Sequence, residues 1–468
     1  MLLSYTAGDK DSLIDSNFFL SLLGFKMIDD VYGNSLSGHQ AVLVGVKLKN
    51  DIMIEVKESV EELRQLAETA SLLILCDSIQ ALTKPNPTFF IGQGKVEELK
   101  NLIGEMDADS IIFDVNLSPA QTRNLEKELD VIVIDRTGLI LEIFAQRAKT
   151  TEAKLQVDIA RHQYAMPRLT RMWTHLSRQA TGGSVGAGKG GGGPVRGAGE
   201  TQLQMDRKLL RQRISKKNRA LNSIEKHRQQ QRKHRSEMLN VSLVGYTNAG
   251  KSTLFNRLTK SGVLAEDKLF ATLDPTTRIF KLPSNHKLLL SDTVGFINKL
   301  PHELVASFKA TLVEVAEADL LLHVADAGHP NLDKHIEVVN EVLTELEAND
   351  VPTILLFNKC DLIDNSRRRF LNTEYPHSIL ASALNGQGFN KLLNSFSNHL
   401  AKQDVRLQID LSYQDQKALD FVYKNGQVFD ANYQPQSITV DARLPNRHMK
   451  KLTKMLCHST YNRSSKIN

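Results

Sequence analysis

The stretch GYTNAGKST, residues 245–253, decides the fold of the second half of the chain. It fits the pattern GxxxxGKS/T, follows the apolar run VSLV (241–244) and precedes the helical pattern LFNRLT (254–259). Backbone N–H groups of such a loop, together with the N-terminus of the following helix, surround the phosphates of a nucleotide. The predicted phosphate-binding residues are Gly245, Tyr246, Thr247, Asn248, Ala249, Gly250, Lys251 and Ser252.

Two side chains of this loop are expected to act on the phosphates. Lys251 should reach the β- and γ-phosphates and take part in catalysis, and the Ser252 hydroxyl should bind Mg²⁺. A threonine from the stretch LFATLDPTTR (269–278) is expected to complete the metal shell. Thr272, Thr276 and Thr277 are the candidates, and the spacing from Ser252 favours Thr272. The predicted contact segment around it comprises Phe270, Ala271, Thr272, Leu273 and Asp274.

Three later segments each follow a predicted strand and indicate a guanine nucleotide. The first is DTVG, with Asp292, Thr293, Val294 and Gly295, where the carboxylate can hold Mg²⁺ through a water molecule and the glycine N–H can meet the γ-phosphate. The second is NKCD, with Asn358, Lys359, Cys360 and Asp361. The Asp361 carboxylate can accept from N1–H and the exocyclic amine of guanine, a donor pair that adenine lacks, so it selects GTP. The third is SAL, with Ser382, Ala383 and Leu384, whose N–H groups can meet guanine O6.

The residue after DTVG is Phe296, where Ras-like enzymes carry a glutamine that orients the attacking water. An apolar side chain cannot position water, so unaided hydrolysis should be slow. Asn248 is a second candidate catalytic residue, because a side-chain carbonyl in the phosphate loop could hold a K⁺ ion near the bridge between the β- and γ-phosphates. A hydrogen bond that stabilises the loop explains Asn248 equally well.

Apolar runs that alternate with helical patterns predict two α/β domains. In the nucleotide domain, residues 238–400, the runs lie at 241–245, 287–292, 320–326, 352–358 and 377–382. Continuous apolar strands between helices are typical of a mostly parallel, doubly wound sheet. A first α/β domain is predicted at 41–150, from the runs at 41–48, 71–76, 110–115 and 131–136. Residues 1–40 stay unassigned, and 401–468 predict a small α+β domain.

A basic helical hairpin is predicted between these domains, at residues 151–237. Two helical patterns, 151–180 with a kink at Pro167 and 201–237, flank a glycine-rich tip at 182–199. An interdomain linker between two surface helices is the alternative. Within the tip, Gly183, Gly188 and Lys189 have phosphate-loop spacing, but no strand precedes them and Gly190 replaces the required hydroxyl, so no second phosphate loop is predicted.

The charge distribution points to a local polyanion partner. The 468 residues carry a net charge of +6, yet residues 201–235 alone carry +10, with twelve Lys and Arg against two acids. The three cysteines are far apart, which argues against a disulfide framework or a zinc site. No apolar run approaches the about 20 residues of a spanning helix, and no secretory signal is evident. We therefore expect a cytoplasmic protein, and nothing demands a state above the monomer.

With these motifs the sequence resembles the HflX GTPases, which are related to Obg within the translation-factor class. The resemblance covers about 41–468. In the nucleotide domain it rests on the phosphate loop and on FATLDPTTR (270–278), DTVGFI (292–297) and LPHELVASFKATL (300–312). In the first half it rests on FFIGQGKVEEL (89–99), LSPAQTRNLE (117–126), VIDRTGLILEIFAQRAKTTEAKLQV (133–157) and RGAGETQLQMDRKLL (196–210).

The resemblance implies a GTPase that binds the ribosome, chiefly the 50S subunit, and splits stalled or idle ribosomes under stress. It also implies that Thr272 is the switch threonine and that the hairpin contacts ribosomal RNA in the peptidyl-transferase region. A ribosome-assembly or RNA-modification GTPase is the alternative, and a structural RNA-binding protein with a vestigial nucleotide site is a third. Some family members hydrolyse ATP in the N-terminal part, and the sequence leaves that open here.

Overall fold

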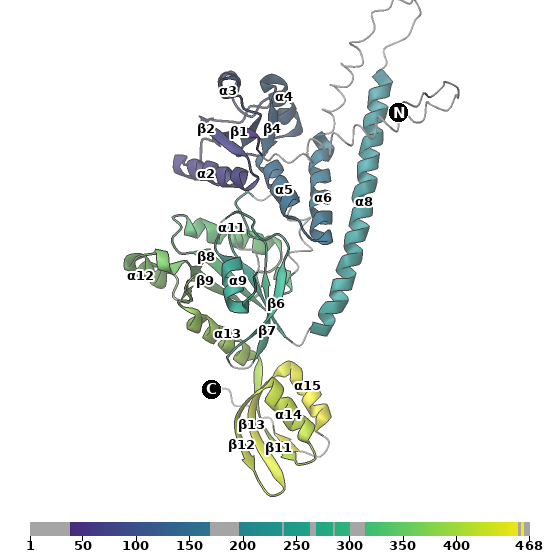
Figure 1. The fold of residues 1–468 in the computed structure, drawn as a ribbon, viewed down its shortest axis with the longest axis vertical. Helices are drawn as coiled ribbons and strands as arrows, with labels where there is room; N and C mark the ends of the chain where they lie inside the picture. The colour runs from purple at the N-terminus through teal and green to yellow at the C-terminus, as the bar shows by residue number, and fades with distance from the viewer. Residues whose placement is uncertain are drawn as a thin grey trace, which may run out of the picture. The chain divides into compact units, whose positions relative to one another are not determined.

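The computed structural model describes residues 38–168, 196–235, 238–262, 268–283, 286–299, 314–456 and 460–462. The chain divides into two compact units, with a boundary between Ser223 and Ile224, inside helix α8 (Arg196–Arg235). The strands of the described residues form three sheets, each with its own helices (Figure 1). The predicted fold class, α/β with a smaller α+β part, is confirmed.

The first sheet is parallel throughout, with the strand order β2-β1-β3-β4. Its strands are β1 (Gln40–Lys47), β2 (Leu73–Ala81), β3 (Ser110–Phe113) and β4 (Ile132–Asp135), and the helices between and after them are α2 (Met53–Thr69), α3 (Gln93–Met106), α4 (Pro119–Leu129) and α5 (Arg136–Arg147). The apolar residues of β1 and β3 are buried, as their continuous apolar sequence predicts. Strand β2 is only partly buried, because it lies at an edge of the sheet.

The second sheet has the order β10-β9-β8-β5-β7-β6, and only β6 is antiparallel to its neighbour. Its strands are β5 (Leu239–Val244), β6 (Thr276–Lys281), β7 (Lys287–Asp292), β8 (Leu320–Asp326), β9 (Thr353–Asn358) and β10 (Ile379–Leu380). The associated helices are α9 (Lys251–Thr259), α11 (Leu332–Glu345), α12 (Asn365–Glu374) and α13 (Phe389–Gln403). Leucines of β5, β7 and β8 pack with Leu254 and Phe255 of α9, which fixes α9 on the sheet.

The third sheet is antiparallel, with the order β12-β13-β11-β14. It comprises β11 (Asp404–Ser412), β12 (Gln427–Tyr433), β13 (Ser437–Pro445) and β14 (Thr460–Asn462), with helices α14 (Gln416–Asn425) and α15 (Asn446–Met455). Alternate residues of β11 and β13, such as Ile409 and Val440, are buried with Val422 and Leu452 of these helices. The period of two in the strands is what an antiparallel sheet with one covered face requires.

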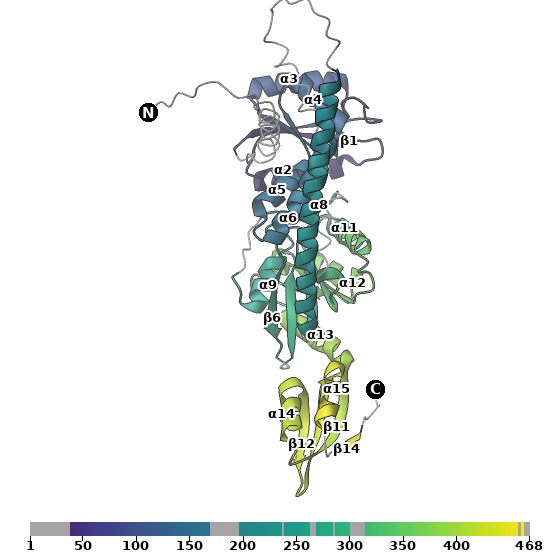
Figure 2. The same ribbon diagram turned by 90° about the vertical axis from the view of Figure 1, so that its right-hand side faces the viewer.

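Helices α6 (Thr151–Ala165) and α8 lie side by side and antiparallel (Figure 2). Lys217 of α8 forms an ion pair with Asp158 of α6 at 2.5 Å, and Leu210 is fully buried. Two expectations need correction. Helix α6 ends at Ala165, and a 3-10 turn that contains Pro167 follows at Met166–Arg168 in place of a kink within the helix; the expected helical residues 169–180 lie outside the described residues. Helix α8 already includes residues 196–199, which the glycine content assigned to the tip; the rest of the tip lies outside the described residues.

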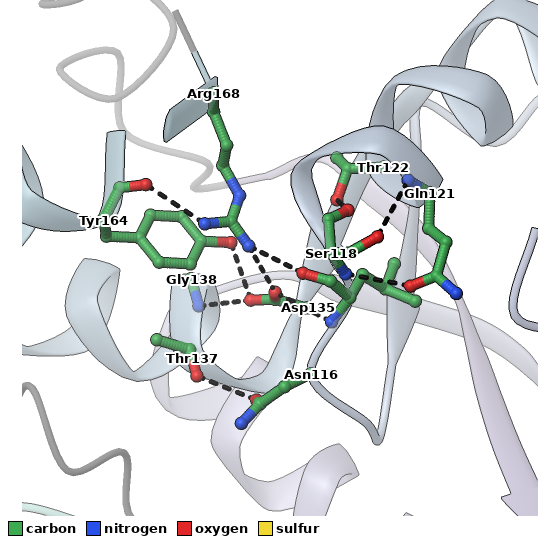
Figure 3. A network of polar contacts seen from close by, with 10 residues as sticks. Asn116, Ser118, Gln121, Thr122, Asp135, Thr137, Gly138, Tyr164 and Arg168 are labelled. Carbon is green, nitrogen blue, oxygen red and sulfur yellow. Dashed lines mark hydrogen bonds and ion pairs between the residues drawn. The ribbon is translucent and has the colours of Figure 1, made fainter. Parts of the chain in front are cut away.

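The Asp135 carboxylate joins α6 to the first sheet (Figure 3). Its Oδ1 accepts hydrogen bonds from the Gly138 N–H at 2.8 Å and the Tyr164 hydroxyl at 2.7 Å. Its Oδ2 accepts from the Leu117 N–H at 3.2 Å and from the Arg168 guanidinium at 3.0 Å. Asp135 ends β4 and caps α5, and it is 1% exposed. One buried carboxylate therefore fixes the end of α6 against the edge of the sheet.

The substitution Asp135→Asn should lower the free energy of unfolding by about 2–3 kcal/mol. An amide replaces one accepting oxygen by two donors, so two of the four donors lose their acceptor in a buried site. Urea denaturation of the full chain measures the loss. Asp130→Asn, at the exposed end of α4, is the matched control and should change the midpoint little. Equal effects of the two substitutions would contradict the role assigned to Asp135.

None of the helices described above is long and apolar enough to cross a membrane.

Candidate functional site

The loop after β5 approaches its neighbours so closely that only glycine fits at two positions. A Cβ on Gly245 would lie 2.1 Å from the Val324 carbonyl oxygen of β8, and φ is +151°. A Cβ on Gly250 would lie 2.2 Å from Nδ2 of Asn358, and φ is +87°. These contacts place the loop over the carboxyl ends of β5 and β8 and start α9 at Lys251.

The Lys251 ammonium is buried inside the loop. Its Nζ donates to the carbonyl oxygens of Gly245 at 3.1 Å and Tyr246 at 2.8 Å, and the residue is 6% exposed. Burial lowers the pKa of Lys251 to about 8, although the charge of Asp292 opposes the shift. A buried cation with only neutral carbonyls as acceptors suits an anionic ligand such as a phosphate.

Three oxygen-bearing side chains that the sequence assigned to metal binding meet at one point. Ser252 Oγ donates to Asp292 Oδ2 at 2.7 Å and lies 2.8 Å from Thr272 Oγ1, which donates to the same carboxylate oxygen at 3.1 Å. Burial raises the pKa of Asp292, while the Ser252 hydroxyl and the Lys251 charge act against this. Hydroxyl and carboxylate oxygens are the ligands that Mg²⁺ prefers, so the donor set fits this ion. Thr277 lies 2.9 Å from Ser291 within the sheet instead.

The DTVG segment lies directly against the phosphate loop. The Thr247 N–H donates to the Phe296 carbonyl oxygen at 2.8 Å, and the Phe296 N–H donates to the Gly245 carbonyl oxygen at 3.1 Å. A Cβ on Gly295 would lie 2.9 Å from Thr247 Cα and 3.0 Å from Lys251 Nζ. The backbone of Gly295 is therefore close to the loop that would hold the phosphates. The Phe296 side chain is 1% exposed and buried, so it cannot orient water in the site.

A hollow that is open to solvent lies among these segments. Ten of the predicted residues line it, namely Thr247, Asn248, Gly250, Lys251, Ser252, Phe270, Ala271, Thr272, Thr293 and Gly295. Thr253 and Lys268 also line it. Thr253 belongs to the phosphate-loop motif and could have been included, whereas no spacing rule marks Lys268.

Several predicted residues have side chains that face away from the hollow. The Tyr246 ring stacks on His335 of α11, with ring centroids 3.7 Å apart and an interplanar angle of 4°. Its hydroxyl accepts the Asn298 N–H at 2.8 Å. Leu273 and Val294 are buried. Backbone groups are what such positions can offer a nucleotide.

Asn248 has a left-handed backbone, with φ of +59°, and an exposed side chain that lines the hollow. Its side chain makes no hydrogen bond to any of the described residues, so the loop-stabilising bond considered above is not seen there. Asparagine tolerates this backbone conformation better than most residues, which gives a further structural reason for its presence.

The Asn358 side chain connects the NKCD segment to the phosphate loop and to the SAL segment. Its Nδ2 donates to the Ala249 carbonyl oxygen at 2.8 Å, and its Oδ1 accepts the Ala383 N–H at 2.9 Å. The carboxamide thus connects the phosphate loop to the SAL segment. Lys359 Nζ pairs with Asp326 Oδ2 at 2.8 Å, and the Cys360 N–H donates to the Ala381 carbonyl oxygen. Within the residues that the structure describes, the half-buried Asp361 carboxylate makes no hydrogen bond, which leaves both of its oxygens able to accept.

Comparison with known proteins agrees with this geometry. Residues 57–145 match the family model "GTP-binding GTPase N-terminal", residues 147–235 match "GTP-binding GTPase Middle Region", and residues 240–359 match "50S ribosome-binding GTPase". A GTPase HflX from Escherichia coli is 42% identical over 424 residues, which cover 89% of this chain and 96% of the relative. One from Magnetococcus marinus is 46% identical over 359 residues, which cover 76% and 81%.

The chain belongs to the HflX GTPase family. It is therefore a P-loop GTPase that binds guanine nucleotides, as the four motifs predict. Among solved structures, a GTP-binding protein from Sulfolobus solfataricus in complex with GDP is 25% identical, covers 77% of this chain and 98% of its own, and has a TM-score of 0.39.

GDP binding to this HflX family member should take up a proton above pH 8. Because the pKa of Lys251 is about 8 without a ligand, most of this group is neutral at pH 8.5, and the phosphates favour its charged form. We expect uptake of about 0.7 proton at pH 8.5, and an affinity for GDP that falls about tenfold from pH 7 to pH 9. Calorimetry in two buffers of different ionisation enthalpy measures the uptake. Guanosine, which lacks phosphates, is the control, and an equal proton uptake with guanosine would contradict this assignment.

Proposed function

We propose that this family member binds the 50S ribosomal subunit and splits stalled or idle ribosomes under stress, in a cycle driven by GTP. The observation that carries the proposal is the exposed side of helix α8, which is rich in cations. The helix directly precedes the GTPase domain in the sequence. Lys208, Arg211, Lys216 and Arg219 are exposed on it. A helix of 40 residues is about 60 Å long, which suits contact with an extended RNA surface.

The nucleotide would act through the DTVG segment, which contacts the phosphate loop at Thr247, and through the segment around Thr272, which contacts Ser252. A γ-phosphate placed beside Lys251 needs the space that the Gly295 backbone borders, so its arrival would move the DTVG segment and break the Thr247–Phe296 hydrogen bond. Ser252 and Thr272 would hold Mg²⁺, with Asp292 beside them, and the ion would neutralise charge on the phosphates. Hydrolysis would let the segment return and release the ribosome.

We further propose that Asn248 holds a K⁺ ion beside the phosphates and so substitutes for the missing glutamine. The support is its position on the hollow, close in sequence to Lys251 and without a partner in the described part of the chain. A monovalent cation there would stabilise the charge that develops between the β- and γ-phosphates.

The proposed function is tested by incubating the full chain with 70S ribosomes and a slowly hydrolysed GTP analogue, followed by sedimentation. Conversion of 70S particles into subunits, together with chain bound to the 50S fraction, is the expected result. Binding only to precursor particles would favour the ribosome-assembly alternative and contradict the proposal.

Charge reversal of Arg207, Lys208, Arg211 and Arg213 to glutamate should weaken ribosome binding by about tenfold or more and leave GTP affinity unchanged. The physical reason is the loss of cations that neutralise RNA phosphates. A matched control reverses four exposed cations of the first domain, Lys49, Lys57, Arg123 and Lys127, and should bind ribosomes nearly normally. The hairpin is not the RNA contact if both variants sediment alike with the 50S subunit.

Replacing K⁺ with Na⁺ should slow GTP hydrolysis by about tenfold or more, because a smaller ion fits the same oxygens poorly. The comparison is made at equal ionic strength by following phosphate release. Asn248→Gly keeps the left-handed backbone but removes the carbonyl oxygen, so its rate should no longer depend on which ion is present. Equal rates in the two salts for the unaltered chain would remove the K⁺ role.

A further inference from the structure

We propose that Arg257 is a positioning residue for the guanine base: it holds the backbone that follows the Leu384 N–H, at the carbonyls of Leu384 and Asn385, so that this N–H donates to guanine O6. The inference rests on the nucleotide site proposed above and specifies one of its contacts. Arg257 belongs to none of the four motifs, and it lies on the exposed side of α9.

The Arg257 guanidinium donates to two successive carbonyl oxygens, that of Leu384 at the end of the SAL segment and that of the next residue, Asn385. Nη1 lies 3.0 Å from the Leu384 oxygen, and Nη2 lies 3.0 Å from the Asn385 oxygen, on residues more than 120 positions away in the sequence. A planar group with parallel donors can hold two neighbouring carbonyls at once, which an ammonium cannot do with the same fixed geometry. Gly386 allows this approach, since a Cβ there would lie 3.0 Å from Nη2.

The N–H groups of this segment are nearly all taken by the protein itself. The Ser382 N–H donates to the Gln387 oxygen, the Ala383 N–H to Asn358 Oδ1, and the Asn385 N–H to Ser382 Oγ. The Gly386 N–H donates to the Ser382 oxygen, and the Gln387 N–H to Asn385 Oδ1. Of residues 382–387, Leu384 alone keeps an N–H without an acceptor among the described residues. It is therefore the group left for guanine O6.

Leu384 needs an external support because its own side chain gives none. The side chain is 75% exposed, so no packing holds the residue in place. The neighbouring Ala383 peptide is fixed by Asn358, and the Leu384 carbonyl on the other side is fixed by Arg257. These two hydrogen bonds hold the peptide units on both sides of the one that carries the Leu384 N–H, and so restrict where this N–H points.

In this arrangement, one helix positions the groups that contact both ends of the nucleotide. Helix α9 begins with Lys251 and Ser252 at the phosphates and reaches the base segment about two turns later with Arg257. The distance between the phosphate contacts and the base contact is then set by the rigid helix.

The substitution Arg257→Gln tests the proposal with three nucleotides at pH 7. In 6-thio-GDP, sulfur replaces O6 and is a weak acceptor, while N1–H and the amine remain. IDP keeps O6 but lacks the amine that Asp361 would accept. The variant should lose about tenfold in affinity for GDP and IDP alike but much less for 6-thio-GDP, so the preference for GDP over 6-thio-GDP should shrink severalfold. The preference for GDP over IDP should stay unchanged, and KM for GTP should rise with kcat unchanged.

Two further variants make the outcome decisive. Arg257→Lys keeps the charge and can still donate to one of the two carbonyls, so its GDP affinity should lie between those of the unaltered chain and the glutamine variant. The lysine variant also serves as the test if Arg257→Gln does not fold. Arg369→Gln removes an equally exposed helical arginine from α12 and should change none of the ratios. An equal loss for all three nucleotides would show that Arg257 only braces the loop, and that result, like no loss at all, would overturn the proposal.

Failure of the site and failure of this inference are distinguishable. If the unaltered chain did not bind GDP, the nucleotide site itself would be wrong. Normal GDP binding with failed ribosome splitting would count against the proposed function and leave the Arg257 experiment decisive by itself.

Discussion

Burial of the Lys251 ammonium is the constraint on which the rest of the site depends. A cation held by neutral carbonyls in a nearly dry loop is costly unless an anion arrives, and the depressed pKa of Lys251 reports that cost. The loop can enclose it only because Gly245 and Gly250 let the backbone pass within contact distance of β8 and Asn358. Ser252, in the same turn of α9, donates a hydrogen bond to Asp292 and lies beside Thr272. One helix turn therefore positions both the buried cation and the cluster of oxygen atoms.

The motif segments could be predicted from the sequence because their chemistry fixes both residue type and place. A phosphate loop must join a strand to a helix, and parallel strands must bring their carboxyl ends to one edge, so DTVG, NKCD and SAL had to lie near it. Thr272 followed from spacing, and the geometry places its hydroxyl on the cluster. Roles of individual atoms in hydrolysis did not follow, since Asn248 fits two explanations on sequence alone.

Other features had no local signature. An exposed arginine on a helix, such as Arg257, is ordinary in sequence, and only the fold shows that its partners are carbonyls of Leu384 and Asn385. The start of α8 was misplaced because glycine content was taken to exclude a helix, yet extending an existing helix costs far less than nucleating one. The Asp135 network was equally hidden, because its partners come from three separate segments.

The exposed side chain of Leu384 has a practical consequence. If only its backbone serves the base, the side chain at this position is free to vary, and a cysteine there could carry an environment-sensitive dye. Cys360 is buried and Cys76 is partly buried, so these two native thiols would compete poorly for the label. Such a fluorophore would sit on the side chain of the residue whose N–H meets the nucleotide and would report nucleotide exchange in real time.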